Sequence, residues 1–194
     1  NLNLVWETSE QTDIGLDLRL FNSKLIFTAD YFDKTTKNLL TPGSPPGFVG
    51  FPIPTINGGN IRNKGFEFEL GYSQSERALK DGISITASAI KNEVTYLNPD
   101  YPRIQGASIY PGWVATAFEV GYPVWYFRGY KTDGIFQDQK EIDQYITDNH
   151  LSGYSPVPGD VRVVNVNGDN IISPADQTYI GSPHPDFMFG SQIS

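Results

Sequence analysis

The residues with the clearest chemical spacing lie in one polar segment, residues 165–176. Twelve-residue calcium loops place oxygen ligands at positions 1, 3, 5, 7, 9 and 12, because this hard cation needs six to eight oxygens at about 2.3–2.6 Å. Here those positions are held by Asn165, Asn167, Asp169, the carbonyl of Ile171, Ser173 and Asp176. The spacing therefore predicts a candidate calcium site.

Three positions of this segment depart from the usual calcium loop. Asn165 stands where Asp is usual, Asn170 where Gly is usual, and Asp176 where the longer Glu is usual. Asn tolerates the left-handed backbone that the sixth position needs, so the turn itself is retained. The alternative is a structural turn in which the Asn and Asp side chains bond their own backbone.

Groups for acid–base or nucleophilic catalysis are sparse. The chain has no Cys, and neither His150 nor His184 lies in a nucleophile motif or at a metal-binding spacing. Glu67 and Glu69 are two residues apart and would suit a glycoside hydrolase. The opposite face of their strand is apolar, however, and if it meets lipid the two glutamates only face a polar interior. We therefore expect that the protein is not an enzyme.

Aromatic residues crowd into the segment 125–130. Such rings stack on sugars, form a girdle at a membrane interface, or pack in a core. We take Trp125, Tyr126 and Tyr130 as the candidate residues that face a substrate or a partner.

Composition limits the classes of protein that need to be considered. The 194 residues carry a net charge of −8, which argues against a nucleic-acid partner because binding to phosphates needs the opposite balance. Nineteen glycines, fourteen prolines and 13% aromatic residues are typical of an all-β protein with many turns. Both ends of the chain look cut, as in a piece of a longer protein.

Alternation of apolar and polar residues predicts about seven antiparallel strands in an up-and-down meander. They cover residues 12–21, 25–33, 64–73, 82–97, 113–120 and 124–136, and the alternation at 187–193. Residues 22–24 are expected to form a tight hairpin turn between the first two strands. A short helix is expected in a long loop, capped by Asp138, with an apolar stripe of Ile142, Tyr145 and Ile146 that runs through to Asp148.

The connections between these strands alternate between short and long. Short ones follow residues 21, 73 and 120, and the long loops lie in 41–60, 98–112 and 137–182. This alternation is typical of an outer-membrane β-barrel, which has short turns at the periplasmic end and long loops outside. The runner-up is a soluble β-sandwich carbohydrate-binding module with a structural calcium.

Six ordered motifs also resemble one family, the TonB-dependent SusC/RagA-type outer-membrane transporters. They are WETSEQTDIGLD (residues 6–17), the strand end YFDKTTKNLL (31–40), NKGFEFEL (63–70), GYKTDGIFQ (129–137), PGD (158–160) and IGSP followed by PDF (180–183 and 185–187). The chain resembles a fragment from the C-terminal half of such a barrel.

The resemblance implies a large, 22-stranded transmembrane barrel with an N-terminal plug. It also implies import of oligosaccharides or peptides, a SusD-like surface lipoprotein as partner, and energy from the TonB complex through an N-terminal region that this chain lacks. The location implied is the outer membrane of a Bacteroidetes-type Gram-negative bacterium. On this interpretation residues 1–194 are a partial barrel domain, and 137–182 form an extracellular loop that holds the helix and the calcium-loop-like segment.

The barrel interpretation assigns the two faces of the predicted strands. Lipid is expected to meet the apolar face, and the lumen the polar one. The apolar set is Ile14, Leu16, Leu18, Phe66, Phe68 and Leu70, and the polar set is Asp13, Asp17, Arg19, Glu67 and Glu69.

Overall fold

The computed structural model describes residues 4–42, 55–74, 81–106, 108–110 and 113–194. The chain divides into two compact units. The strand unit comprises residues 1–104, 118–124 and 184–194, and the loop unit comprises residues 105–117 and 125–183. No helix among the described residues is long and apolar enough to cross a membrane.

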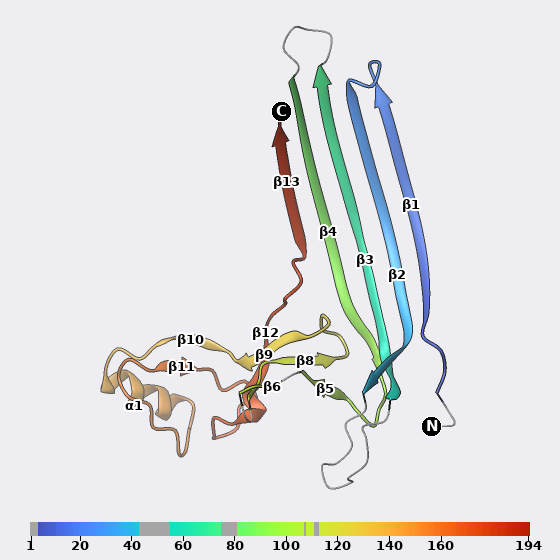
Figure 1. The fold of residues 1–194 in the computed structure, drawn as a ribbon. Helices are drawn as coiled ribbons and strands as arrows, with labels where there is room; N and C mark the ends of the chain where they lie inside the picture. Colours follow the sequence, from blue (N-terminus) through green and yellow to red (C-terminus); the bar gives the residue numbers. More distant parts are fainter. Residues whose placement is uncertain (1–3, 43–54, 75–80, 107, 111–112) are drawn as a thin grey trace. The chain divides into compact units, whose positions relative to one another are not determined.

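The strand unit is built on one antiparallel sheet of five long strands (Figure 1). Its order is β1 (Thr8–Leu20), β2 (Leu25–Pro42), β3 (Thr55–Gln74), β4 (Asp81–Leu97) and β13 (Phe187–Ile193). The first four follow one another as a meander, as predicted, and residues 98–186 come between β4 and β13.

A tight turn joins β1 to β2, where the sequence predicts one. The amide of Lys24 donates to the carbonyl oxygen of Phe21 at 3.2 Å. Phe21, Asn22 and Ser23 have φ values of 55°, 56° and 63°, in the left-handed region. Such a backbone is costly for residues with a Cβ, and it gives the turn a sharp reversal that keeps the two strands in register.

The predicted loop 41–60 is partly wrong, because residues 55–60 are strand. Residues 43–54 of that loop lie outside the described residues. Gly58 and Gly59 are buried, and a Cβ on Gly59 would lie 2.3 Å from the carbonyl oxygen of Tyr96 on β4. Glycines that suggest a loop in the sequence therefore permit close approach of a neighbouring backbone.

Gly65 in the middle of β3 has the same role. A Cβ there would lie 2.4 Å from the carbonyl oxygen of Ala89 and 3.0 Å from the ring of Phe32. We expect Gly65→Ala to lower the free energy of unfolding by about 1–3 kcal/mol, because strands β3 and β4 must shift to admit the methyl group. Denaturant-induced unfolding of the full-length protein measures this loss.

A glycine on the same strand provides the control for Gly65. At Gly71 the nearest atom to a new Cβ is the Cβ of Ile26 at 3.8 Å, an ordinary contact. Gly71→Ala should therefore unfold close to the wild type. Equal losses from the two variants would contradict the role given to Gly65.

A small core lies at the end of β4 in the strand unit. Val94, Leu97 and Phe118 are buried together, and Leu39, Ile61, Ile104 and Val124 pack around them. The amide of Val94 donates to the carbonyl of Tyr122 at 2.9 Å, and that of Val124 to Oδ1 of Asn92 at 2.7 Å. Residues 118–124 thus pack on the sheet end rather than extending the meander.

The loop unit contains short strands in place of the two long ones predicted for 113–120 and 124–136. Its elements and those at its boundary are β5 (Arg103–Gln105), β6 (Ser108–Tyr110), β7 (Trp113–Val114), β8 (Thr116–Glu119), β9 (Tyr126–Tyr130), β10 (Thr132–Ile135), β11 (Val161–Val163), a 3-10 turn (Pro174–Asp176) and β12 (Gln177–Gly181). Strand β9 pairs antiparallel with residues 116–117 and with β12, β10 pairs with β11, and β6 with β7. The predicted strands 113–120 and 124–136 are thus still joined by a short turn and pair with each other in part, through residues 116–117 and 126–127. Neither of them belongs to the five-stranded sheet.

The predicted helix is confirmed as α1 (Gln139–Asp148) in the loop unit (Figure 1). Asp138 caps it, accepting a hydrogen bond from the amide of Glu141 at 2.9 Å. Ile142 is buried, and the hydroxyl of Tyr145 donates to the carbonyl oxygen of Val163 at 2.7 Å. The apolar stripe therefore anchors the helix on β11.

Candidate functional site

One face of the five-stranded sheet is apolar across all five strands. The strand register aligns four rows of side chains on this face. In the order β1-β2-β3-β4-β13 the rows are Ile14, Tyr31, Phe66, Ala89, Phe187; Leu16, Ala29, Phe68, Ala87, Phe189; Leu18, Phe27, Leu70, Ile85, Ser191; and Leu20, Leu25, Tyr72, Ile83, Ile193. We call these twenty residues the apolar band.

The apolar band is exposed in the structure. Ile14 is 66% exposed, Phe66 63% and Phe189 64%. A soluble β-sandwich would bury such a face under a second sheet. An exposed apolar surface on this scale requires another apolar phase or partner. A single exposed sheet of this kind does not match the runner-up interpretation, a soluble β-sandwich module, and favours the barrel.

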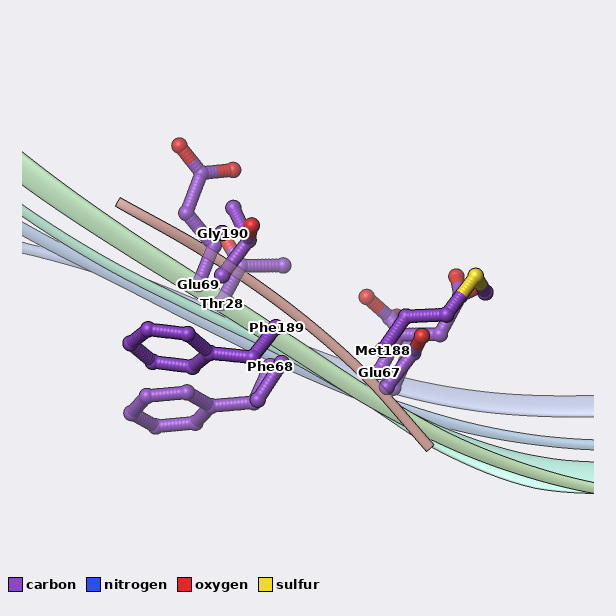
Figure 2. Close-up of a pocket in the computed structure, with 11 residues that line it drawn as sticks. Thr28, Glu67, Phe68, Glu69, Met188, Phe189 and Gly190 are labelled. Carbon is purple, nitrogen blue, oxygen red and sulfur yellow. The ribbon is translucent and has the colours of Figure 1, made fainter. Parts of the chain in front are cut away.

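The opposite face of the same sheet is polar and acidic. It carries Asp13, Asp17 and Asp30 together with Glu67 and Glu69. Figure 2 shows a shallow pocket on this sheet, with Phe68 and Phe189 pointing to one side and Glu67, Glu69 and Met188 to the other. The predicted grouping of apolar residues on one face of β1 and β3 and polar residues on the other is confirmed, and the assignment of these faces to lipid and lumen stays a prediction.

Glu67 and Glu69, the pair considered for glycoside hydrolysis, lie on this polar face. Glu67 and Glu69 lie across the strand pair from Asp30 and Thr28, and Thr28 donates to a carboxylate oxygen of Asp17 at 2.8 Å. These groups form an open wall of like charges, with small hydroxyl side chains between them. Such a wall is suited to contact with water or polar solutes.

Charged residues end the apolar band at the end of the sheet where β2 leads to β3. The next two rows on the same face are Thr12, Asp33, Lys64, Lys91 and Glu10, Thr35, Arg62, Glu93. Lys37 pairs with Glu10 at 2.7 Å, Lys91 with Glu93 at 2.7 Å, and Arg62 with Asp33. This boundary was not predicted, although the alternation of side chains along the same strands places the charged residues on the face of the apolar band. Charged side chains are costly in an apolar environment, so these rows mark the end of the apolar band.

Residues 165–176 form a compact turn held by side-chain oxygens. The Oδ1 atom of Asn165 accepts from the amide of Gly168 at 2.9 Å, and Oδ1 of Asn167 from the amide of Asp169 at 3.0 Å. Oδ1 of Asp169 accepts from the amide of Ile171 at 2.9 Å. These are the bonds that the structural-turn alternative expects.

Asp176 is the last residue of this turn and is completely buried. Its carboxylate accepts from the amides of Ser173 at 2.8 Å, Val166 at 2.9 Å and Asn167 at 3.4 Å. Burial opposes ionisation of Asp176, but these backbone hydrogen bonds outweigh it and hold the pKa of the carboxyl below its usual value. Ser173 also caps the short 3-10 turn by accepting from the amide of Ala175 at 3.2 Å.

The six predicted calcium ligands thus lie in one turn, though their side-chain oxygens are engaged with the backbone. The described residues contain no group of three or more His, Cys, Asp or Glu side chains suited to a metal ion. Calcium binding by this segment remains a prediction. The Oδ1 atoms of Asn165, Asn167 and Asp169 each accept one backbone amide and keep a lone pair with which they could also contact a cation.

The three candidate aromatic residues are placed differently from one another. Trp125 is 39% exposed and Tyr130 36%, whereas Tyr126 is 2% exposed and packs against the ring of Tyr179 at 5.7 Å. Tyr126 is therefore a core residue in this structure, a correction to its assignment as a substrate-facing one. Trp125 has φ 54°, which sets it at the corner where the turn enters β9.

A pocket in the loop unit escaped the sequence analysis. It is bounded by β9, β12 and the β6–β7 segment, and Arg128, Tyr130, Gln177, Ile109, Tyr110 and Val114 are among its lining residues. Gln177 meets Arg128 and Tyr130 through the pairing of β9 with β12, and the amide of Arg128 donates to the carbonyl oxygen of Ala115, next to Val114. Tyr130, already a candidate, is the single member that the sequence indicated.

Comparison with known proteins gives consistent matches. The model of the family "TonB dependent receptor-like, beta-barrel" matches residues 1–171. TonB-dependent receptors P3 and P26 of Formosa agariphila are 32% and 33% identical to this chain over 194 residues, which is 98% of this chain and 19% of each relative. The chain therefore spans about a fifth of the length of these relatives.

Solved structures share the fold. The RagAB peptide transporter superposes on all of this chain and on 20% of its own, with a TM-score of 0.71 and 21% identity. The RagAB peptide importer in the "closed-closed" state gives a TM-score of 0.69 at 22% identity, again over all of this chain and 20% of its own.

Proposed function

Because the chain belongs to the family of TonB dependent receptor-like β-barrels, we propose that it forms part of the wall of an outer-membrane transporter. The cargo proposed is an oligosaccharide or a peptide. The partners proposed are a SusD-like surface lipoprotein and the TonB complex, the latter reached through a region outside this chain. No residue carries out a reaction, and the mechanism is gated passage.

The observation that carries this proposal is the two-faced sheet. An apolar band on one face and an acidic face behind it fit a strand wall with lipid outside and a polar lumen inside. The charged rows above the band fit the aqueous side. The solved structural neighbours include a protein described as a peptide transporter, which supports a peptide as one of the two cargo classes.

The loop unit is proposed to lie outside the cell and to contact substrate or the lipoprotein. It is connected to the sheet at the end that carries the charged rows, through the segments that follow β4 and precede β13. Trp125 and Tyr130 supply exposed rings for such contacts, and Tyr126 supports them from the core.

Uptake by cells that express the full-length protein tests the proposal. Fluorescently labelled oligosaccharides and peptides are supplied to cells with and without a working TonB complex, and with and without a SusD-like surface lipoprotein. Accumulation of one probe class that depends on TonB is expected. Uptake that is the same in a TonB-deficient host, or in cells lacking the barrel protein, would refute transport.

Calcium binding in residues 165–176 is a separate proposal about the same loop unit. A bound ion would stabilise the folded state by mass action. The melting temperature of the full-length protein should then rise with calcium and fall with chelator, and the rise should vanish in Asp169→Ala. Equal melting temperatures of the wild type with and without calcium would remove the ion and leave the structural turn.

A further inference from the structure

The pocket beside Arg128 in the loop unit has the features of a ligand site. We propose that it binds the carboxylate of an incoming substrate, with the guanidinium of Arg128 as the anchor and Tyr110 and Tyr130 as flanking rings. This inference rests on the proposed transport function and names the chemical class of the cargo.

Strand pairing brings the anchor and its neighbours to one face. Tyr130 lies opposite Gln177, and Arg128 lies opposite Tyr179. Because side chains alternate along a strand, these four residues share a face with the buried Tyr126. The rings of Tyr126 and Tyr179 pack against each other on this face, with their centroids 5.7 Å apart, and both residues are near Arg128 in the strand pair.

The Arg128 side chain is held in place while much of its donor capacity remains for a ligand. Its Nη1 donates to Oε1 of Gln177, and its backbone amide donates to the carbonyl oxygen of Ala115 at 2.8 Å. A guanidinium has five N–H donors in a fixed fork, which fits both oxygens of one carboxylate. Gln177 therefore orients the fork without neutralising its charge.

Arg128 differs from Arg162, the other arginine of the loop unit, in its charged neighbours. The ion pairs found among the described residues of this unit belong to Arg162, which contacts Asp133 at 2.6 Å and Glu141 at 2.5 Å. Arg128 has no carboxylate partner among them. In a chain of net charge −8, a cationic group in a pocket is selective for an anion that the rest of the surface repels.

The walls of the pocket fit the body of such a ligand. Ile109 is 77% exposed and Tyr110 70%, and both line the pocket across from Tyr130. Exposed rings stack on the flat apolar faces of sugars and on apolar side chains. The site is therefore suited to a carboxylate carried on a compact body, as in a uronic acid residue or at the C-terminus of a short peptide.

The test measures binding to the full-length protein with its lipoprotein, purified in detergent. The probes are trigalacturonate with its methyl ester, and trialanine with its C-terminal amide. We expect the acid form of one pair to bind about tenfold to a hundredfold more tightly than its neutral form, as a charge-assisted bidentate contact gives. The pair that shows this preference identifies the source of the carboxylate.

Two arginine variants separate the pocket from general electrostatics. Arg128→Gln should abolish the preference, by bringing the affinity for the acid form down to about that for the neutral form. Arg103→Gln removes the same charge from an exposed position that does not line the pocket, and should keep the preference. Gln177→Leu provides a second variant that should weaken the preference without removing the charge.

The outcomes distinguish failure of the pocket from failure of the transport proposal. A wild type that shows no acid preference with either pair, or an Arg128→Gln protein that keeps it, would overturn the carboxylate site while TonB-dependent uptake stands. Absence of uptake by the wild type would overturn transport, whatever the binding result.

Discussion

Leu70→Arg should lower the free energy of unfolding of the full-length protein in lipid by about 2–4 kcal/mol, because a cation near the bilayer midplane is costly. Leu70 lies in the third of the four rows of the apolar band, between Phe27 and Ile85. Denaturant-induced unfolding in lipid vesicles measures the loss. The effect should be accompanied by less folded protein in the outer membrane.

The adjacent residue of the same strand is the matched control. Glu69 lies at nearly the same depth but on the acidic face (Figure 2). Glu69→Arg should change stability little, since water or polar groups can solvate the new charge. Equal losses from Leu70→Arg and Glu69→Arg would contradict the assignment of the two faces.

Asp176→Ala should destabilise the turn at residues 165–176 by about 1–3 kcal/mol or more, because it leaves buried donors without an acceptor. The amides of Val166 and Ser173 should exchange with solvent faster, and the turn should be cut sooner by protease. Hydrogen exchange measured by mass spectrometry on the full-length protein detects this. Asp169→Ala, which removes an exposed carboxylate from the same turn, should cost less.

The same carboxylate gives the turn a defined dependence on pH. Its folded-state pKa is lowered, so its contribution to stability is present above the unfolded pKa of about 4 and is lost as pH falls through the folded value. Exchange of these amides, corrected for intrinsic rates, should therefore increase below about pH 4 in the wild type. The Asp176→Ala variant should lack this change, and the same pH profile in both proteins would contradict the role of the carboxylate.

The long sheet was the most predictable part of the fold. Residues 12–21 and 82–97 alternate cleanly between apolar and polar side chains, and the structure gives strands Thr8–Leu20 and Asp81–Leu97. The alternation is clear because one face of the sheet is mainly apolar and the other mainly polar, so the type of each residue depends on the face that it occupies. The family motifs indicated that this meander is part of a larger barrel.

The parts that the sequence misplaced have physical reasons. Residues 55–60 contain Gly58 and Gly59, whose lack of a Cβ serves close strand contact but is indistinguishable in sequence from a loop. Residues 113–120 alternate as strands do, yet alternation does not say which strand is the neighbour. Phe118 packs into a core with Val94 instead of joining the long sheet.

Candidate sites were harder to predict than strands, because they depend on pairing between distant segments. Arg128 and Gln177 meet through the register of β9 with β12, and no local pattern specifies that register. An aromatic run likewise does not reveal which ring is buried, and only Tyr126 of the predicted set proved to be core. The 165–176 turn was recognisable because the side chains of Asn165, Asn167 and Asp169 bond to backbone amides two or three residues away.

The height of the apolar band has a consequence for where the protein can be stable. Four rows take eight residues, about 27 Å along a strand, and a tilt of about 40° reduces this to about 20 Å across the membrane. The charged rows at one end prevent the sheet from sliding deeper. A bilayer with a hydrocarbon core of about 30 Å would have to thin around such a wall, whereas the thinner outer membrane fits it better. On the proposed placement in a membrane, hydrophobic mismatch therefore favours the thinner of two bilayers.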